Sequence, residues 1–300
     1  MSPWRRLAGV LAVAWLPCAQ AAVCGSDGVW IQVLGSIEPG ADGRPLSSSF
    51  LVWLDGKARV LVDTGNGSAG NFYGNGARLA DLDVILLTYL HVDHTADLPT
   101  LIQASLPEKR ARALPIYGPA RSKLAPSTVT FVRTLFDNKR GLYRYLGAFL
   151  SPLGRETYKL QPHDVRIKRR YVPDVYRNER VRVSAAAAVR DPVLALAWRL
   201  QTRGKFIVFV SNVSNNSDGL DQMGRGADLL VVHSPVRNDM TRSLRTYHMS
   251  LATIAQLASD IGAKKLALTH RVRARDDEQT VGKTYSGAIV VAGEGDCFSP

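Results

Sequence analysis

The chain has 300 residues and a formal net charge of +12, from 38 Lys and Arg against 26 Asp and Glu. This length is sufficient for one large domain with its own core. There is no Gly-rich phosphate loop, nucleophile elbow or zinc finger, so the classes that those motifs define are excluded. The positive charge favours an anionic partner such as a phosphorylated small molecule, nucleic acid or a membrane surface, although many secreted proteins are basic without a charged ligand.

The first 21 residues have the pattern of a secretory signal peptide. Arg5 and Arg6 are followed by a short apolar run, residues 7–16, and by the small-residue end Ala19-Gln20-Ala21. The apolar run is too short to anchor the protein in a bilayer. We therefore expect a single domain, residues 22–300, that is periplasmic or secreted and not membrane-anchored.

Short strands are expected over residues 30–70, where WIQVLGS, SFLVWLDG and ARVLVDTG alternate apolar and polar residues between turns. Residues 84–118 predict a strand, a helix beginning near Asp97, and a second strand. Four further strands are expected in RVRVSAAAAV, LALAWRLQT, KFIVFVS and ADLLVVHS. A helix over residues 250–261 and the strand KKLALT follow.

Ligand-type side chains are concentrated in the segment LLTYLHVDHTADLP, residues 86–99. The run from Val84 to Thr88 predicts a buried strand, which ends by delivering His91, Asp93 and His94 into a turn. Two imidazoles and one carboxylate within four residues can converge on one metal ion. The same residues are also compatible with a polar connection that only caps the following helix.

The segment resembles the HxHxDH signature of the metallo-β-lactamase superfamily. Three other stretches follow in that family's order: LVDTGNGS (61–68), FVSNVSNNSDGL (209–220) and YHMSLATIAQLASDIGAKKLALTHR (247–271). The resemblance runs from about residue 30 to the end and is nearest to the ribonuclease Z and cyclic-nucleotide phosphodiesterase branches. It implies an α/β fold, the four-layer αββα metallo-β-lactamase sandwich, with ligands at strand ends along one edge.

The resemblance also implies that one of the family's two metal sites is lost. Tyr89 stands at the first His of the signature, Arg190 at the third His of the first site, and Val213 at the Asp that bridges both ions. Of the first-site ligands, only His91 remains. A cation beside Arg190 is disfavoured, because two like charges at ~4 Å repel by about 1 kcal/mol even in water.

The second site of the family keeps Asp93, His94 and His270. Two His and one carboxylate with open positions suit Zn²⁺, and also Mn²⁺ or Fe²⁺. We therefore expect one divalent metal ion, zinc before manganese or iron, with His91 as a neighbouring ligand-type residue. The alternative is a decayed site that holds no ion.

A basic, aromatic segment at about residues 121–180 is the candidate for a lid, because related hydrolases carry an insertion over the cleft here. Its aromatic and guanidinium groups can stack on a ring and hold phosphate. It can equally be an amphipathic helical hairpin that packs its aromatic side chains on the core and leaves its arginines in solvent.

Cys24 and Cys297 are the two cysteines that remain after signal removal. In an oxidising compartment two cysteines favour one disulfide, and the resemblance places the first strand beside the C-terminal segment. We expect a bridge with a Cα separation within ~4.4–6.8 Å. Two separate thiols are the alternative.

The resemblance implies an exported hydrolase that uses one divalent metal ion on an anionic, phosphoester-like small molecule; the basic charge leaves nucleic acid open as a substrate. In this interpretation Asp93 or His248 handles protons, while Arg190 replaces the charge of the lost ion and contacts the substrate together with Tyr89. The alternative is a non-catalytic pseudoenzyme that binds an anionic ligand through Arg190, Tyr89 and the lid.

Overall fold

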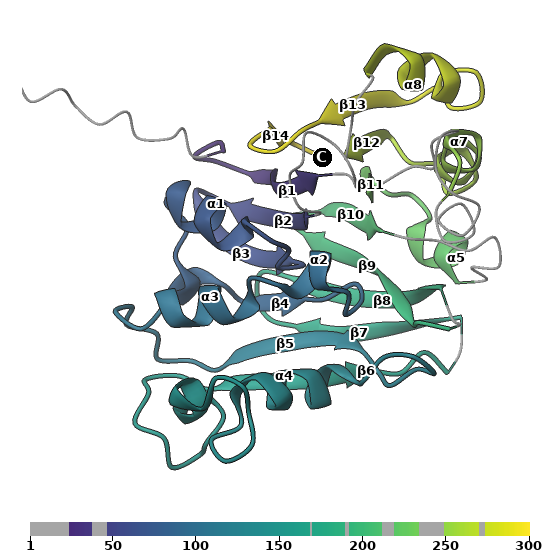
Figure 1. Ribbon diagram of the computed structural model, residues 1–300. Coiled ribbons are helices and arrows are strands. Elements are labelled where there is room, and N and C mark those ends of the chain that lie inside the picture. Colours follow the sequence, from purple (N-terminus) through teal and green to yellow (C-terminus); the bar gives the residue numbers. More distant parts are fainter. Residues whose placement is uncertain are drawn as a thin grey trace, which may run out of the picture.

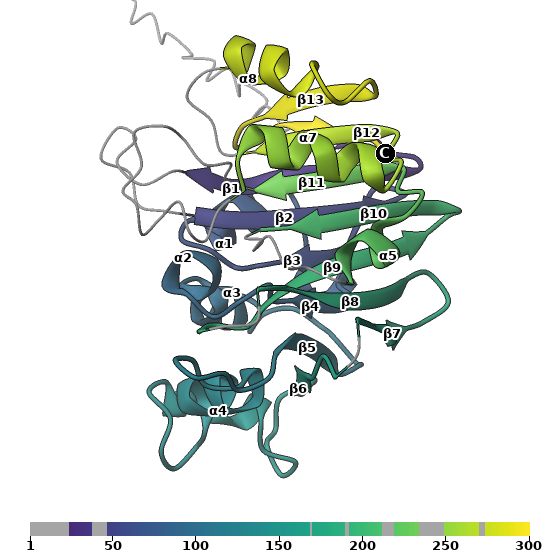
Figure 2. The same ribbon diagram turned by 90° about the vertical axis from the view of Figure 1, so that its right-hand side faces the viewer.

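The computed structural model describes residues 24–37, 47–168, 170–189, 192–211, 219–233, 249–269 and 274–300. Two seven-stranded sheets, in the orders β14-β1-β2-β3-β4-β5-β6 and β13-β12-β11-β10-β9-β8-β7, pack face to face. Helices α1 to α4 lie outside the first sheet, and α5, α7 and α8 lie outside the second (Figure 1, Figure 2). The predicted four-layer αββα sandwich is confirmed.

The strands of the first sheet are β1 (Val29–Ile37), β2 (Ser47–Leu54), β3 (Lys57–Val62), β4 (Val84–Leu86), β5 (Leu114–Pro119), β6 (Leu160–Val165) and β14 (Cys297–Phe298). Those of the second are β7 (Tyr171–Arg177), β8 (Arg182–Val189), β9 (Ala195–Thr202), β10 (Lys205–Val210), β11 (Leu229–His233), β12 (Lys265–Thr269) and β13 (Ala288–Ala292).

The helices are α1 (Ser68–Gly74), η1 (Leu79–Asp81), α2 (Val92–Thr95), α3 (Leu98–Ala104), α4 (Thr128–Phe136), η2 (Arg144–Phe149), α5 (Leu220–Gly224), α7 (Leu251–Asp260) and α8 (Ala274–Val281). The helix expected over residues 250–261 is α7, and Ser250 caps it by accepting a hydrogen bond from the backbone N–H of Thr253. Within the described residues, no helix has the length and apolar character needed to cross a bilayer.

The core is divided into three apolar layers because each sheet is covered on both faces. Phe50 and Phe209 meet between the sheets with ring centroids 5.7 Å apart. Separate clusters lie between the first sheet and its helices and between the second sheet and its helices. Every residue of β2 is buried, as expected for a strand in the middle of such a stack.

The parallel strands β3, β4 and β5 decide where a site can form. β3 pairs with β4, and β4 with β5, all in parallel. Their carboxyl ends therefore meet at one edge of the first sheet, where ligand-binding residues of α/β folds gather. The segment 86–99 leaves the sheet at this edge.

A disulfide joins Cys24 to Cys297, with a Cα separation of 5.7 Å, so the predicted bridge is confirmed. It lies where β14 pairs with β1 in antiparallel register, Ile31 opposite Phe298 and Gln32 opposite Cys297. The bridge and these two residue pairs hold β14 against β1.

Candidate functional site

Two loops meet at the carboxyl ends of β3 and β4. The backbone N–H of Thr64 donates to His94 O at 2.8 Å, and that of Asp97 donates to Thr64 O at 2.9 Å. Gly65, in the loop after β3, lies very close to the loop after β4. A Cβ at position 65 would stand 2.2 Å from the carbonyl oxygen of Asp93. Glycine is therefore required at position 65, and it fixes the Asp63–Gly65 loop against the turn that carries the predicted ligands.

Asp63 is a functional residue that the sequence reasoning missed. It is fully buried and has a φ of 59°, an uncommon value for a non-glycine residue that suggests functional constraint. Its carboxylate accepts hydrogen bonds from the backbone N–H of Thr88 and from the Thr88 hydroxyl, both at 2.7 Å. The Asp-Thr-Gly turn was the available signal, but it gave no indication of the side chain's partner.

The third partner of Asp63 is His94. Nδ1 of the His94 ring lies 2.7 Å from Asp63 Oδ2. Because a carboxylate only accepts, Nδ1 carries the proton in this contact and Nε2 faces the other way. This carboxylate–histidine arrangement is the one that orients metal-binding imidazoles.

Nε2 of His94 lies 3.4 Å from Oδ2 of Asp93. Two ligands of a tetrahedral ion, each at ~2.1 Å, are separated by about this distance. The two side chains therefore fit a shared divalent ion. Although burial favours the neutral ring, the charges of Asp63 and Asp93 raise the pKa of His94 to about 9. The same negative charges favour a cation at Nε2.

Tyr89 and His91 flank this pair. Tyr89 is buried, and its ring centroid lies 4.0 Å from that of His94 and 4.8 Å from that of His91. Its side chain thus occupies space beside His94, at the position aligned with the family's first ligand. His91 is more exposed, and partial burial lowers the pKa of its imidazole.

The second sheet reaches the same place. The hydroxyl of Ser211, just after β10, donates to the Thr88 hydroxyl at 3.3 Å, and the backbone N–H of Leu196 in β9 donates to Thr88 O at 2.8 Å. These contacts place Ser211 and Leu196, both from the second sheet, next to Thr88. The edge of the candidate site is therefore formed by both sheets.

Four of the predicted positions lie outside the described residues: Arg190, Val213, His248 and His270. Within the described part of the chain, no group of three or more His, Cys, Asp or Glu forms a complete metal site. The structure therefore brings together Asp93, His94, His91 and Tyr89, and the placement of the third ligand stays a prediction.

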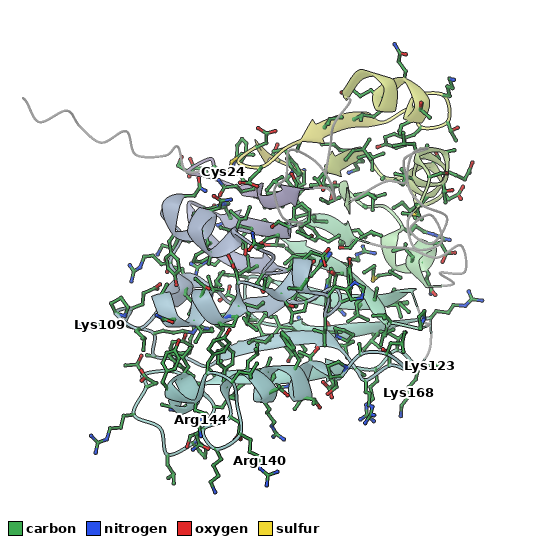
Figure 3. The ribbon with its side chains drawn as sticks, viewed as in Figure 1. Cys24, Lys109, Lys123, Arg140, Arg144 and Lys168 are labelled. Carbon is green, nitrogen blue, oxygen red and sulfur yellow. A yellow bond between two sulfur atoms is a disulfide. The ribbon has the colours of Figure 1, made fainter. Side chains whose placement is uncertain are left out.

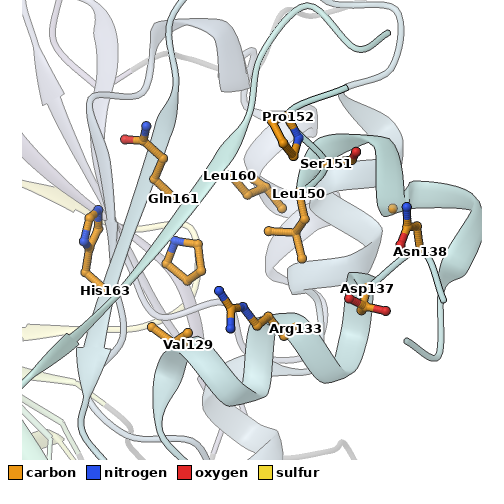
Figure 4. A pocket seen from close by; sticks show the side chains of 12 residues that line it. Val129, Arg133, Asp137, Asn138, Leu150, Ser151, Pro152, Leu160, Gln161 and His163 are labelled. Atoms are coloured by element: carbon orange, nitrogen blue, oxygen red, sulfur yellow. The ribbon is translucent and has the colours of Figure 1, made fainter. Parts of the chain in front are cut away.

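The segment expected as a lid, residues 121–180, contains several kinds of structure. It includes α4, η2 and the edge strands β6 and β7, which were not predicted. Phe136 and Phe149 are buried under this layer, whereas Arg133, Arg140 and Arg144 are exposed. Residues 128–149 thus have the packing of an amphipathic element. A cavity of about 640 Å³ lies between α4, η2 and β6, and its lining includes none of the candidate metal ligands (Figure 4).

Comparison with known proteins agrees with this geometry. A family model described as a Beta-lactamase superfamily domain matches residues 58–271. Ribonuclease Z of Mycolicibacterium gilvum is 27% identical over 261 residues, covering 81% of this chain and 84% of that protein. The metallo-beta-lactamase fold protein YhfI from Bacillus subtilis and the short form of human tRNase Z each give a TM-score of 0.65 at 19% identity, covering 90% of this chain and 98% of theirs.

These matches confirm the resemblance found in the sequence. The family model spans more than half of the chain and includes the Asp63 turn and the segment 86–99. The protein therefore belongs to the beta-lactamase superfamily.

Proposed function

We propose that this protein is a metal-dependent hydrolase of phosphoester substrates, with a single divalent ion held by Asp93, His94 and His270. The observation that carries the proposal is the buried Asp63–His94 pair, which presents Nε2 3.4 Å from the Asp93 carboxylate. Superfamily membership and the ribonuclease Z relatives support a metal-dependent hydrolase. We propose one ion and not two because Tyr89, Arg190 and Val213 stand where the family has ligands of its first metal site.

A divalent ion held at this site, zinc before manganese or iron, would supply the positive charge needed to activate water and to polarise a phosphoryl oxygen. The chain's own residues do the remaining work. Asp63 keeps His94 in one tautomer, and Tyr89 packs against that ring, which holds it in one orientation. The Asp93 side chain is 19% exposed, so its carboxylate is accessible to solvent. Arg190 is proposed to hold the anionic substrate bidentately.

The substrate class follows from the relatives and from charge. Proteins named ribonuclease Z and tRNase Z are similar over most of this chain, so a nucleic-acid phosphodiester is a candidate substrate beside smaller phosphoesters. The net charge of +12 favours such anions. Bis(4-nitrophenyl) phosphate is a suitable assay substrate, because it contains a phosphodiester bond but no base or sugar that the protein would have to recognise.

Export to an oxidising compartment is part of the proposal. The signal-peptide pattern of residues 1–21 and the Cys24–Cys297 disulfide support it, because disulfides persist mainly outside the cytosol. Cell fractionation with an antibody, together with the N-terminal sequence of the purified protein, tests it. A cytosolic protein that retains residues 1–21 would contradict it.

The decisive experiment measures metal content and hydrolysis together. The purified chain, reconstituted with zinc, manganese or iron, is analysed for ions per chain and for cleavage of bis(4-nitrophenyl) phosphate. We expect one ion per chain, with activity and the ion both lost in Asp93→Asn and His270→Ala. His163→Gln is the control, because His163 stacks on Tyr117 away from the site and should leave both readings unchanged.

Two results would contradict the proposal. Two ions per chain would show that the first site is functional despite Tyr89. No bound ion after reconstitution, together with no hydrolysis, would favour the non-catalytic anion-binding alternative, because the remaining side chains cannot generate hydroxide at neutral pH.

A further inference from the structure

Most of the net positive charge of this protein is concentrated in one part of the chain. Residues 106–168, here called the basic end, contain 13 Lys and Arg against 4 Asp and Glu, a net +9 of the whole chain's +12. Ten of these cations are exposed, whereas none of the four acids is. The exposed cations are Lys109, Arg121, Lys123, Arg133, Lys139, Arg140, Arg144, Arg155, Arg166 and Lys168.

Three of the four acidic side chains of the basic end accept hydrogen bonds from backbone N–H groups. Glu108 accepts hydrogen bonds from the backbone N–H groups of Leu79 and Ala80, and Asp137 accepts from those of Lys139 and Arg140. Asp164 accepts from the backbone N–H of Val129. Within the described part of the chain, none of the ten exposed cations is in an ion pair with a carboxylate. The surface is therefore positive almost without compensation.

The same region exposes large hydrophobic side chains. Seven such side chains are exposed in the described residues, and all but Val92 belong to the basic end. They are Leu106 (48%), Leu124 (71%), Leu142 (73%), Tyr143 (37%), Tyr145 (65%) and Leu153 (92%). Scattered exposed leucines need no explanation, but a cluster inside a cationic surface marks an interaction site.

Residues 142–145, here called the exposed tip, are held in place by hydrogen bonds. After α4 the chain is fixed by backbone hydrogen bonds from Leu142 to Thr134 and from Tyr143 to Leu135, at 2.9 and 2.7 Å. The Tyr145 hydroxyl donates to Gln103 at 2.6 Å, which ties this tip to the C-terminal turn of α3 near Leu106. Leu142 and the tyrosines are thus held outward by the fold.

Both views place α4 and its loops at one end of the molecule, opposite α8 and β13 (Figure 1, Figure 2). Figure 3 shows Lys109, Arg140, Arg144, Lys123 and Lys168 along the margin of that end, with their side chains projecting outward. The charged and apolar groups therefore belong to one end that a flat partner can approach.

The cavity between α4, η2 and β6 opens within this end. The Arg133 guanidinium points into it, between the apolar side chains of Val129 and Leu150 (Figure 4). No described residue accepts a hydrogen bond from Arg133. The lining also includes the polar side chains of Asp137, Asn138, Ser151 and Gln161. A guanidinium in such a mixed cavity suits the phosphate of an amphipathic molecule, because the polar and apolar parts of the ligand both find contacts.

We propose that the basic end docks on the surface of an anionic phospholipid bilayer. Clustered cations are attracted to anionic headgroups, while exposed leucine and tyrosine side chains enter the boundary between headgroups and acyl chains. A nucleic acid would use the cations and the tyrosines but offers little for the exposed leucines. Such peripheral docking needs no spanning helix or lipid anchor. It involves the end formed by α4 and β6 and does not depend on the metal site.

The test is cosedimentation of the full chain with vesicles of phosphatidylcholine alone or mixed with phosphatidylglycerol. We expect binding to the anionic vesicles only, weakened by salt. Each cation near an anionic leaflet contributes about fivefold in affinity, so Arg140→Gln with Arg144→Gln should weaken binding by about thirtyfold. Arg225→Gln with Lys283→Gln removes the same charge from exposed positions outside the basic end and should have little effect.

A second pair separates insertion from charge alone. Leu142→Ser with Leu153→Ser keeps every charge and should reduce binding at least several-fold, most clearly at salt concentrations that screen the cations. Hydrolysis of bis(4-nitrophenyl) phosphate should be unchanged in all these variants, so failure here is distinguishable from failure of the proposed function.

Three outcomes would overturn the inference. The first is that the control variant, Arg225→Gln with Lys283→Gln, loses as much affinity for anionic vesicles as Arg140→Gln with Arg144→Gln. The second is that the serine variant binds as tightly as the wild type at every salt concentration. The third is that an RNA oligonucleotide binds through Arg140 and Arg144 while neither kind of vesicle binds, which would assign this end to nucleic acid instead.

Discussion

Two buried aspartates lie at opposite ends of the parallel pair β3 and β4, and they have different partners. Asp63 follows β3 and binds Thr88 and His94, leaving the outer nitrogen of the imidazole directed at Asp93. Asp83 precedes β4 and accepts from Arg180 twice, at 2.8 and 2.9 Å, and from Arg112 at 2.5 Å.

The difference is in what each carboxylate leaves available. At Asp83 one negative charge faces two guanidiniums whose donors are aimed inward, so the cluster joins β4 to residues 112 and 180 and stabilises the fold. At Asp63 the partner is a histidine with two functional nitrogens, so binding one of them orients the other. The same residue type, equally buried, therefore joins parts of the fold at one end and orients a candidate metal ligand at the other.

The largest difference should come from replacing each aspartate by asparagine. In Asp63→Asn the amide nitrogen faces His94 Nδ1, which favours the tautomer whose proton is on Nε2. Because a protonated Nε2 cannot bind metal, we expect metal affinity and hydrolysis to fall by about 10- to 100-fold. Chelator competition and turnover measure this, and Asp83→Asn is the matched control. Equal turnover of Asp63→Asn and Asp83→Asn would contradict the different roles assigned to the two aspartates.

Asp83→Asn should instead act on stability. It leaves Arg112 and Arg180 facing each other without a counter-charge, but both are about 40% exposed, so water relieves part of the cost. We expect a loss of about 2 kcal/mol in the free energy of unfolding, less than for a fully buried pair. Urea denaturation measures it, and a variant as stable as the wild type would show that the cluster contributes nothing.

The pH dependence of unfolding isolates the same cluster. Burial by itself would raise the pKa of the Asp83 carboxyl, but the hydrogen bonds and charges of Arg180 and Arg112 lower it to about 2. Since the unfolded value is about 3.9, this contribution is present above that pH and is lost as the pH falls toward the folded value. Wild type should lose more stability than Asp83→Asn between neutral pH and about pH 3; parallel curves would contradict this.

The smallest expected effect is that of Arg180→Lys. The change keeps the charge but removes the two parallel hydrogen bonds to Asp83, so we expect a loss of about 1 kcal/mol in unfolding free energy and unchanged turnover. Thermal unfolding and the hydrolysis assay check both. A loss as large as that of Asp83→Asn would mean that geometry, rather than charge, determines the stability of the cluster.

The fold was largely predictable because its central strands are buried and their patterns are strong. The stretch ARVLVDTG covers β3 except for its first residue, KFIVFVS contains β10, and Ser250 predicted the start of α7. The edge strands β6 and β7 were missed, since LQPHDV and YVPDVYR each contain a proline and lack a clear apolar alternation. Proline is tolerated there because an edge strand has one side without a partner.

The site was predictable where residue type alone carries the chemistry. His94 and Asp93 were predicted from the turn after β4. Asp63 was not, because its role depends on a contact across 31 residues and on a left-handed backbone conformation, neither of which the sequence displays. The close approach that requires Gly65 likewise becomes visible only when the two loops are placed together.

The pairing of β1 with β14 has a consequence for how the protein is made. These strands are neighbours in space but are separated by nearly the whole chain, and the bridge beside them spans 273 residues. During synthesis the first sheet therefore stays open at one edge until the last strand has emerged. A variant without β14 would lose both the disulfide and the strand that covers the edge of β1, so the first sheet can be completed only after residues 297 and 298 have been synthesised.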